Sequence, residues 1–328
     1  MTTFYSITAI IAGFAILIWG ADRFIDGAAN IARNFGVSPL IVGLTIVGFG
    51  TSAPEMLVSA LAAFDGAPAL GVGNALGSNI ANIGMVLGIT ILITPLTVNP
   101  DTLRREFPML AVVMALALWL LWDQFLGYND GLILFAGFIL TLCGMAFIAL
   151  KSSQTDPLKE KLNDEYADVS MTTRQAITSF IIGLTALLIG SKTLVWGATG
   201  IATLLGVSEL VIGLTIVAIG TSLPELAASI ISALKNEHDL AIGNILGSNV
   251  FNILAVLAMP GLIMPAATDN EILQRDFPMM VLLFILLFAF SKFGKDGRIG
   301  RIAGGTLLML YIAYTSLLVY QSTVGITA

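Results

Sequence analysis

The sequence has few charged residues for its length. Only 11% of the 328 residues are Asp, Glu, Lys or Arg, and 57% are hydrophobic, whereas soluble domains carry roughly 25% charge. A soluble chain of this composition would expose large apolar patches to water, and a lipid bilayer would solvate the same surface. The composition therefore excludes an ordinary soluble domain and predicts an integral membrane protein, with the lipid bilayer as its surroundings.

Cysteine and histidine are almost absent. The single cysteine, Cys143, cannot form a disulfide within the chain, and we expect it to be a small packed apolar residue. One histidine, His238, leaves no Cys/His set for a soft transition metal. The net charge of −6 and the lack of a basic stripe give no indication of nucleic-acid binding. We expect no enzyme activity, no prosthetic group and no protein partner.

Long apolar runs fill most of the chain. Many approach the ~20 residues that a membrane-spanning helix needs, and they lack the alternation of about 10-residue barrel strands. The fold class is therefore expected to be all-α and polytopic, with about ten transmembrane helices. We place these helices at residues 4–32, 38–63, 69–93, 104–122, 130–150, 173–203, 208–234, 239–264, 275–292 and 300–320.

The two halves of the chain repeat each other without gaps. FGVSPLIVGLTIVGFGTSAPE begins at Phe35 and LGVSELVIGLTIVAIGTSLPE at Leu205, which is 170 residues later. GNALGSNIANI and GNILGSNVFNI follow at the same separation, as do REFPM and RDFPM. A constant offset over three motifs indicates internal duplication.

The duplication predicts the domain organisation. A first five-helix repeat occupies residues 1–150, a polar loop 151–172, and a second five-helix repeat 173–328. Because five is odd, the second copy enters the membrane from the opposite side. Inverted repeats of this kind are typical of secondary transporters, whose sites lie near the bilayer midplane where the repeats meet.

Lysine and arginine predict the orientation. Of the fifteen, twelve fall on the odd-numbered connections, only Arg275 falls on the other face, and Arg23 and Lys192 lie within spans. Because cytoplasmic loops are enriched in Lys and Arg, we expect the 151–172 loop to be cytoplasmic and both termini to lie outside, in an inner or plasma membrane. For Arg23 and Lys192, extension of the side chain to the membrane interface and a role in gating both stay open.

Two glutamates carry the sharpest functional signal. Glu55 and Glu225 each lie in the middle of a long apolar run, within GTSAPE and GTSLPE. A carboxylate in the bilayer is costly and usually marks an ion or proton path. The alternative is a hydrogen-bonded glutamate that locks two helices, which two equivalent copies in identical motifs disfavour.

The residues around the glutamates add oxygen ligands. Pro54 and Pro224 each remove a backbone donor, so both helices are expected to kink and free the carbonyls of nearby residues. Hydroxyls, carbonyls and carboxylates are hard ligands, and Ca²⁺ takes six to eight oxygens. The carbonyls are those of Gly48, Thr51, Ala218 and Thr221, and the hydroxyls are those of Thr51, Ser52, Thr221 and Ser222.

The second motif places polar side chains on a helix face. Ser78 and Asn82, like Ser248 and Asn252, are four residues apart and therefore share one face. For Asn79 and Asn249, hydrogen bonding between helices is the favoured interpretation.

GxGTSxPE followed by GNxxGSNxxN, present twice, resembles the α-repeats of the sodium/calcium exchanger (cation/calcium antiporter) superfamily, close to its bacterial YrbG-type members. The resemblance covers essentially the whole chain. It implies a ten-helix fold in which helices two, three, seven and eight form an ion-binding core, against which helices one and six slide. It also implies that Ca²⁺ and Na⁺ are transported ions. The residues it places at the ions are Glu55, Glu225, Thr51, Thr221, Ser52, Ser222, Ser78, Ser248, Asn82, Asn252, Gly48 and Ala218.

The chain departs from this pattern at Asn252, where an archaeal-type pattern has Asp. That departure leaves the stoichiometry open. Antiport of Ca²⁺ against Na⁺ is the leading function. Proton coupling on the same fold stays an alternative, since a buried Glu can carry H⁺. A non-transporting membrane receptor or a channel is the third possibility, and inverted duplication with a closed midplane site disfavours the channel.

Overall fold

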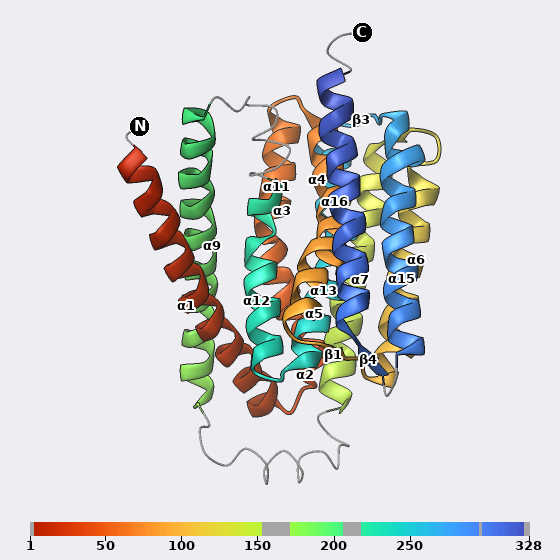
Figure 1. Ribbon diagram of the computed structural model, residues 1–328. Helices are drawn as coiled ribbons and strands as arrows, with labels where there is room; N and C mark the ends of the chain where they lie inside the picture. Colours follow the sequence, from red (N-terminus) through yellow and green to blue (C-terminus); the bar gives the residue numbers. More distant parts are fainter. Residues whose placement is uncertain (1–2, 153–170, 206–217, 295–296, 325–328) are drawn as a thin grey trace.

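The computed structural model describes residues 3–152, 171–205, 218–294 and 297–324. It is a bundle of long helices that run roughly parallel to one another (Figure 1). We call upper end the end at which α1 begins and α16 ends, and lower end the one at which α1 ends and α9 begins. The first half contains α1 (Thr3–Phe35), α2 (Pro39–Val42), η1 (Gly43–Val47), α3 (Gly48–Phe64), α4 (Pro68–Ala81), η2 (Asn82–Leu87), α5 (Gly88–Ile93), β1 (Leu96–Thr97), α6 (Pro100–Leu120), β2 (Phe125–Leu126) and α7 (Tyr128–Ser152).

The second half begins with a helix that runs opposite to the first helix of the chain. Helix α1 runs from the upper to the lower end, and α9 returns upward beside it (Figure 1). The elements of this half are α9 (Thr173–Leu204), α11 (Ala218–Thr221), α12 (Leu223–Leu234), α13 (His238–Phe251), η4 (Asn252–Val256), α14 (Ala258–Ile263), β3 (Ala266–Ala267), η5 (Ile272–Asp276), α15 (Phe277–Phe293), β4 (Arg298–Ile299) and α16 (Arg301–Val324). The elements named η are π-helical turns.

Eight helices of the described chain are long and apolar enough to cross a membrane. Two expected spans are not among them. Helix α6 has 21 residues, but its first two turns contain four charged residues, Asp101, Arg104, Arg105 and Glu106. Helix α12 has 12 residues, and most of the sequence expected to precede it in the 208–234 span lies outside the described residues, as does most of the 151–172 loop.

The most apolar surface faces outward. Trp119, Leu140 and Met309 are 66–72% exposed, whereas the span His238–Ile263 is buried along its whole apolar window. A chain that hides its central helix and exposes large apolar side chains fits a bilayer. Cys143 also lies on this outer surface of α7, so the expectation that it is packed is wrong. Lipid can solvate a thiol that water would favour burying.

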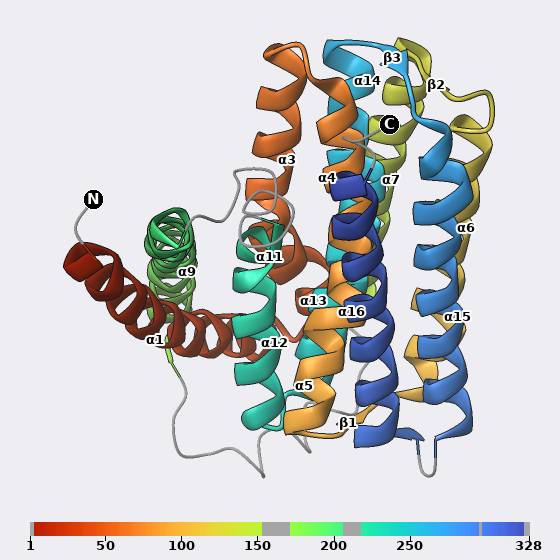
Figure 2. The ribbon, with the colours of Figure 1, turned by 45° about the horizontal axis from the view of Figure 1, so that its top comes forward.

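Helices α1 and α9 form a pair that stands beside the rest of the bundle (Figure 2). Glycine permits their close approach. A Cβ on Gly27 would lie 2.4 Å from Phe180 N, and one on Gly183 would lie 2.3 Å from Phe24 N. The same seven-residue spacing holds on both helices, at Gly13, Gly20 and Gly27 and at Gly183, Gly190 and Gly197.

The turns that follow α3 and α12 show the repeat at the level of the backbone. Gly66 and Asn236, again 170 residues apart, both adopt a left-handed φ, of 83° and 60°. In each turn the next residue donates a backbone hydrogen bond five residues back, from Ala67 to Ala62 and from Glu237 to Ser232. A hydrogen bond of this kind is common where a helix ends at a residue with a left-handed φ.

Two short antiparallel ladders tie the halves together. Strand β1 pairs with β4, and β2 pairs with β3, so each ladder joins a strand of one half to a strand of the other. The β1–β4 ladder lies at the lower end and the β2–β3 ladder at the upper end (Figures 1 and 2).

Candidate functional site

The two glutamates lie at the centre of the bundle. Glu55 on α3 and Glu225 in the first turn of α12 are each 1% exposed. Asn244 links their surroundings, since its Oδ1 accepts from Thr51, one turn before Glu55, and its Nδ2 donates to the Glu225 carbonyl. The structure therefore brings together two residues that are 170 positions apart in the sequence.

The helix is interrupted next to the proline in only one of the two halves. Ser222, with φ −89° and ψ 3°, separates α11 from α12, whereas α3 continues as a helix through Pro54. The kink expected at Pro54 stays a prediction, since a helix that continues through a proline can bend there. In the first half, α13 packs against η1 and α3, and Ser248 Oγ donates to the Gly48 carbonyl at 3.4 Å. Neighbouring helices of this kind allow proline inside a membrane helix.

Thr51 connects the two halves of the site. Its hydroxyl lies 3.2 Å from Asn244 Oδ1 and 3.3 Å from Ser248 Oγ, both on α13. It also lies 3.3 Å from the carbonyl oxygen of Gly48. The predicted residues Thr51, Gly48 and Ser248 therefore form one contact group.

Two asparagines that the sequence analysis did not select hold the glutamate backbones. Asn74 Nδ2 donates to the Glu55 carbonyl at 3.1 Å and to Ser59 Oγ at 3.0 Å. Asn244 Nδ2 makes the same bonds in the other half, at 3.3 Å to the Glu225 carbonyl and 3.0 Å to Ser229 Oγ. The signal was available, because these asparagines open the repeated GNxxGSN motif at the common offset.

The π-helical turns begin at predicted site residues. Asn82 is the first residue of η2 and Asn252 the first of η4. Turn η2 contacts α12 and η4 contacts α3, so each asparagine begins a turn packed against the glutamate helix of the opposite half. π-Helical turns within α-helices are frequent at functional sites.

The centre holds buried oxygens without a hydrogen-bond partner among the described residues. These are Ser52 Oγ, Glu55 Oε2, Asn82 Oδ1, Glu225 Oε2 and Asn252 Oδ1. Buried polar atoms are nearly always bonded, and each exception needs an explanation. Five such oxygens, two of them from carboxylates, are the donor set that a hard cation prefers.

The remaining predicted residues lie in the same elements. Ser78, Ser222 and Ser248 are buried, and Thr221 is half-buried. Ala218 begins α11. Asn79 and Asn249 bond across helices, as expected: Asn79 Nδ2 contacts Met280 Sδ at 3.6 Å, and Asn249 Oδ1 accepts from Asn82 Nδ2 at 3.2 Å.

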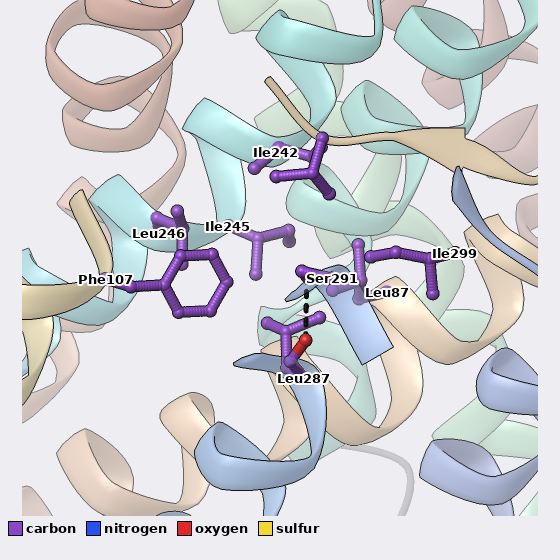
Figure 3. A pocket seen from close by; sticks show the side chains of 9 residues that line it. Leu87, Phe107, Ile242, Ile245, Leu246, Leu287, Ser291 and Ile299 are labelled. Carbon is purple, nitrogen blue, oxygen red and sulfur yellow. Dashed lines mark hydrogen bonds between the residues drawn. The ribbon is translucent and has the colours of Figure 1, made fainter. Parts of the chain in front are cut away.

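A small cavity elsewhere in the bundle has a different character. Its lining includes Phe107, Ile242 and Ile299, with Ser291 as the one hydroxyl (Figure 3). The Ser291 hydroxyl donates to the Leu287 carbonyl of its own helix at 2.7 Å. This apolar cavity therefore offers no cation ligands, in contrast to the glutamate centre.

Comparison with known proteins agrees with this geometry. The family model for the sodium/calcium exchanger protein matches residues 5–147 and 175–320. The chain is 48% identical over 310 residues to CaxA of Alkalimonas amylolytica (94% of this chain, 97% of that protein). It is 38% identical over 318 residues to the inner membrane protein YrbG of Escherichia coli (96% and 97%).

A solved structure of the sodium-calcium exchanger NCX_Mj, soaked with Na⁺ and Ca²⁺, superposes with a TM-score of 0.81 at 33% identity, covering 95% of this chain and 97% of that one. The family model accounts for both halves of the chain, including both glutamate motifs. The chain therefore belongs to the sodium/calcium exchanger family and is a multi-pass membrane transport protein rather than an enzyme.

Proposed function

We propose that this protein exchanges Ca²⁺ for Na⁺ across the inner (plasma) membrane by alternating access. The observation that carries the proposal is the group of buried oxygens around Glu55 and Glu225 that have no hydrogen-bond partner among the described residues. Two ionised carboxylates neutralise one Ca²⁺, and Na⁺ would compete for the same oxygens. Mutual exclusion at a shared site is what couples the two fluxes, and Ca²⁺ and Na⁺ are cargo rather than resident cofactors.

The proposed ligand set combines carboxylates, hydroxyls, amides and carbonyls from both halves. Glu55 and Glu225 bind Ca²⁺ and share Na⁺, and the carbonyls of Thr51 and Thr221 complete the calcium site. Asn82 and Asn252 line the centre. Flanking Na⁺ sites take the hydroxyls of Ser52, Ser78, Ser222 and Ser248 and the carbonyls of Gly48 and Ala218.

The architecture that we propose is ten transmembrane helices in two inverted five-helix repeats, at residues 1–150 and 173–328, joined by a cytoplasmic loop at 151–172. The opposite directions of α1 and α9, and the placement of one strand ladder at each end, support inversion. We also propose that both termini are outside. Both described ends of the chain lie at the upper end, whereas most Lys and Arg lie at the lower end.

Proton-coupled antiport on the same fold is the second candidate. The Oε2 atoms of Glu55 and Glu225, which have no hydrogen-bond partner within the described part of the chain, suit a proton as well as a metal ion. Uptake of radioactive calcium into reconstituted vesicles distinguishes Na⁺ coupling from H⁺ coupling. One set of vesicles is given a Na⁺ gradient and the other a pH gradient. We expect uptake with the Na⁺ gradient, and uptake driven only by the pH gradient would replace Na⁺ by H⁺ as the coupling ion.

The orientation has its own test. In a Cys143→Ala background, Phe64→Cys at the upper end should react with an impermeant thiol reagent applied outside cells. Phe35→Cys at the lower end should react only after permeabilisation. Both native side chains are exposed, at 73% and 54%, so the matched pair differs in side rather than burial. The reverse pattern would overturn the proposed topology.

A further inference from the structure

Ion pairs fasten α1 to the core at the lower end. Lys235, in the turn after α12, contacts Asp22 and Asp26 of α1, with N–O distances of 2.6 Å in both cases. Arg33 contacts Glu237 of the same turn at 2.8 Å. All three pairs join the α1–α9 pair to the turn between α12 and α13.

The repeat places the opposite charges at the upper end. The residue 170 positions after Asp22 is Lys192 on α9, and the residue 170 positions before Lys235 is Asp65, in the turn after α3. The two signs are exchanged, so the pair of opposite charges is retained. The other two ion pairs of the lower end have no charge-paired equivalent in the repeat.

In the present conformation this second pair is not made. Lys192 and Asp65 are both exposed, and within the described chain neither takes part in an ion pair. Helix α1 packs along α12, whereas the equivalent helices α9 and α3 make far less contact. Figures 1 and 2 show the upper part of α9 standing apart from α3.

We propose that Lys192 and Asp65 form the ion pair that closes the upper end when the α1–α9 pair moves to the other side of the transport cycle. They are positioning residues, since neither is part of the glutamate centre. The Lys235 pairs with Asp22 and Asp26 then open as the Asp65–Lys192 pair forms. This inference rests on the proposed alternating access.

The alternative is that the Lys192 ammonium extends to the membrane interface and Asp65 is a solvated turn residue. In that case the two side chains would have no relation to each other. The present positions of Asp22 and Lys235 argue otherwise, since these equivalent residues do meet.

Cross-linking tests the approach of the two residues without any assumption about the cargo. In the full-length Cys143→Ala protein, Asp65→Cys with Lys192→Cys should form a disulfide under oxidation. Asp65→Cys with Thr193→Cys is the matched control, since consecutive residues of a helix point about 100° apart. Cross-linking of the first pair no greater than that of the control, in Na⁺ and in Ca²⁺, would overturn the proposal.

Charge reversal tests the role in exchange. Asp65→Lys and Lys192→Asp should each slow calcium exchange about threefold or more, the scale of a partly exposed ion pair replaced by repulsion. The double reversal should return the rate to within about twofold of the unmodified protein at equal thermal stability. A double variant that exchanges calcium as slowly as the single variants would contradict the proposed ion pair. Absence of exchange in the unmodified protein would instead count against the proposed function, and the cross-link would still stand.

Discussion

The two copies of the Gly-Asn motif differ in what covers them. On α13, Gly243 and Gly247 are buried, and a Cβ on Gly247 would lie 2.3 Å from the Leu44 carbonyl oxygen of η1. On α4, Gly73 is exposed, and a Cβ on Gly73 or Gly77 would meet no described atom within 4 Å. Among the described residues, the α13 copy is therefore packed against η1, whereas for the α4 copy the residues equivalent to η1, 213–217, lie outside the described chain.

The difference extends to the polar residues of each half. Asn244 is fully buried and Asn74 is half-buried, and the same holds for Thr51 and Thr221. Helix α4 descends from the upper end and α13 rises from the lower end (Figure 1), so the less buried copy of the motif lies on the helix that begins at the upper end.

The largest effect should come from substitution of Glu55 or Glu225, at which the two halves are alike. Glu55→Gln and Glu225→Gln should each reduce calcium exchange by at least about 100-fold, because Gln keeps the shape and loses the charge that neutralises the cation. Vesicle uptake at matched protein level measures this, and an intact thermal transition controls for folding. Normal flux in either variant would remove that glutamate from the site.

The equivalent glycines Gly247 and Gly77 should respond differently to substitution. Gly247→Ala should lower thermal stability in detergent by about 1–3 kcal/mol, since its Cβ would collide with the η1 backbone. Gly77→Ala should leave stability unchanged or raise it by up to about 1 kcal/mol.

Calcium exchange gives a second comparison of the Gly77 and Gly247 variants. If α4 becomes packed as closely as α13 at another step of transport, the Cβ of Gly77→Ala would obstruct that packing. Calcium exchange should then fall although thermal stability does not. Equal stability losses in the two variants would contradict the asymmetry. Full exchange with Gly77→Ala would contradict a symmetric closure.

A smaller effect is expected at a bond present in one half only. Pro224 has no N–H for the Gly220 carbonyl, and Ser191 Oγ of α9 donates to that carbonyl at 2.7 Å. The equivalent residue on α1 is Ala21, which has no hydroxyl.

Ser191→Ala should therefore change the exchange rate by a few-fold and lower stability by about 1 kcal/mol, the usual net value of a hydrogen bond. Vesicle uptake and a thermal shift measure the two effects. Ser191→Thr, which keeps the hydroxyl, is the control. An unchanged rate and transition in Ser191→Ala would show that this bond does not matter to the cycle.

The smallest effect, none at all, is predicted for potassium. With Asn82 and Asn252 both neutral, the centre has two carboxylates and one Ca²⁺ balances them, so replacing K⁺ by choline should leave calcium flux unchanged. Asn252→Asp adds a third carboxylate, and we expect slower exchange or some dependence on a second cation. Loss of flux in choline would show that the charge count is wrong.

Much of the fold followed from composition and pattern. Nine of the ten expected spans overlap long helices of the described residues. The glutamate pair was also predictable, because a carboxylate in an apolar run stands out. The roles of Asn74 and Asn244 were missed, since their bonds go to backbone atoms of another helix and leave no trace in local periodicity.

The sequence by itself determined the bilayer environment, the duplication and the chemical type of the centre, because each depends on which residues are present and at what spacing. Only the tertiary structure decided which copy of the Gly-Asn motif is more buried, that Lys235 meets Asp22 and Asp26, and that α3 stays helical through Pro54 while Ser222 separates α11 from α12. The physical reason is that two copies of one motif carry nearly the same local preferences. Their difference arises from how whole helices are placed against each other, which no single repeat encodes.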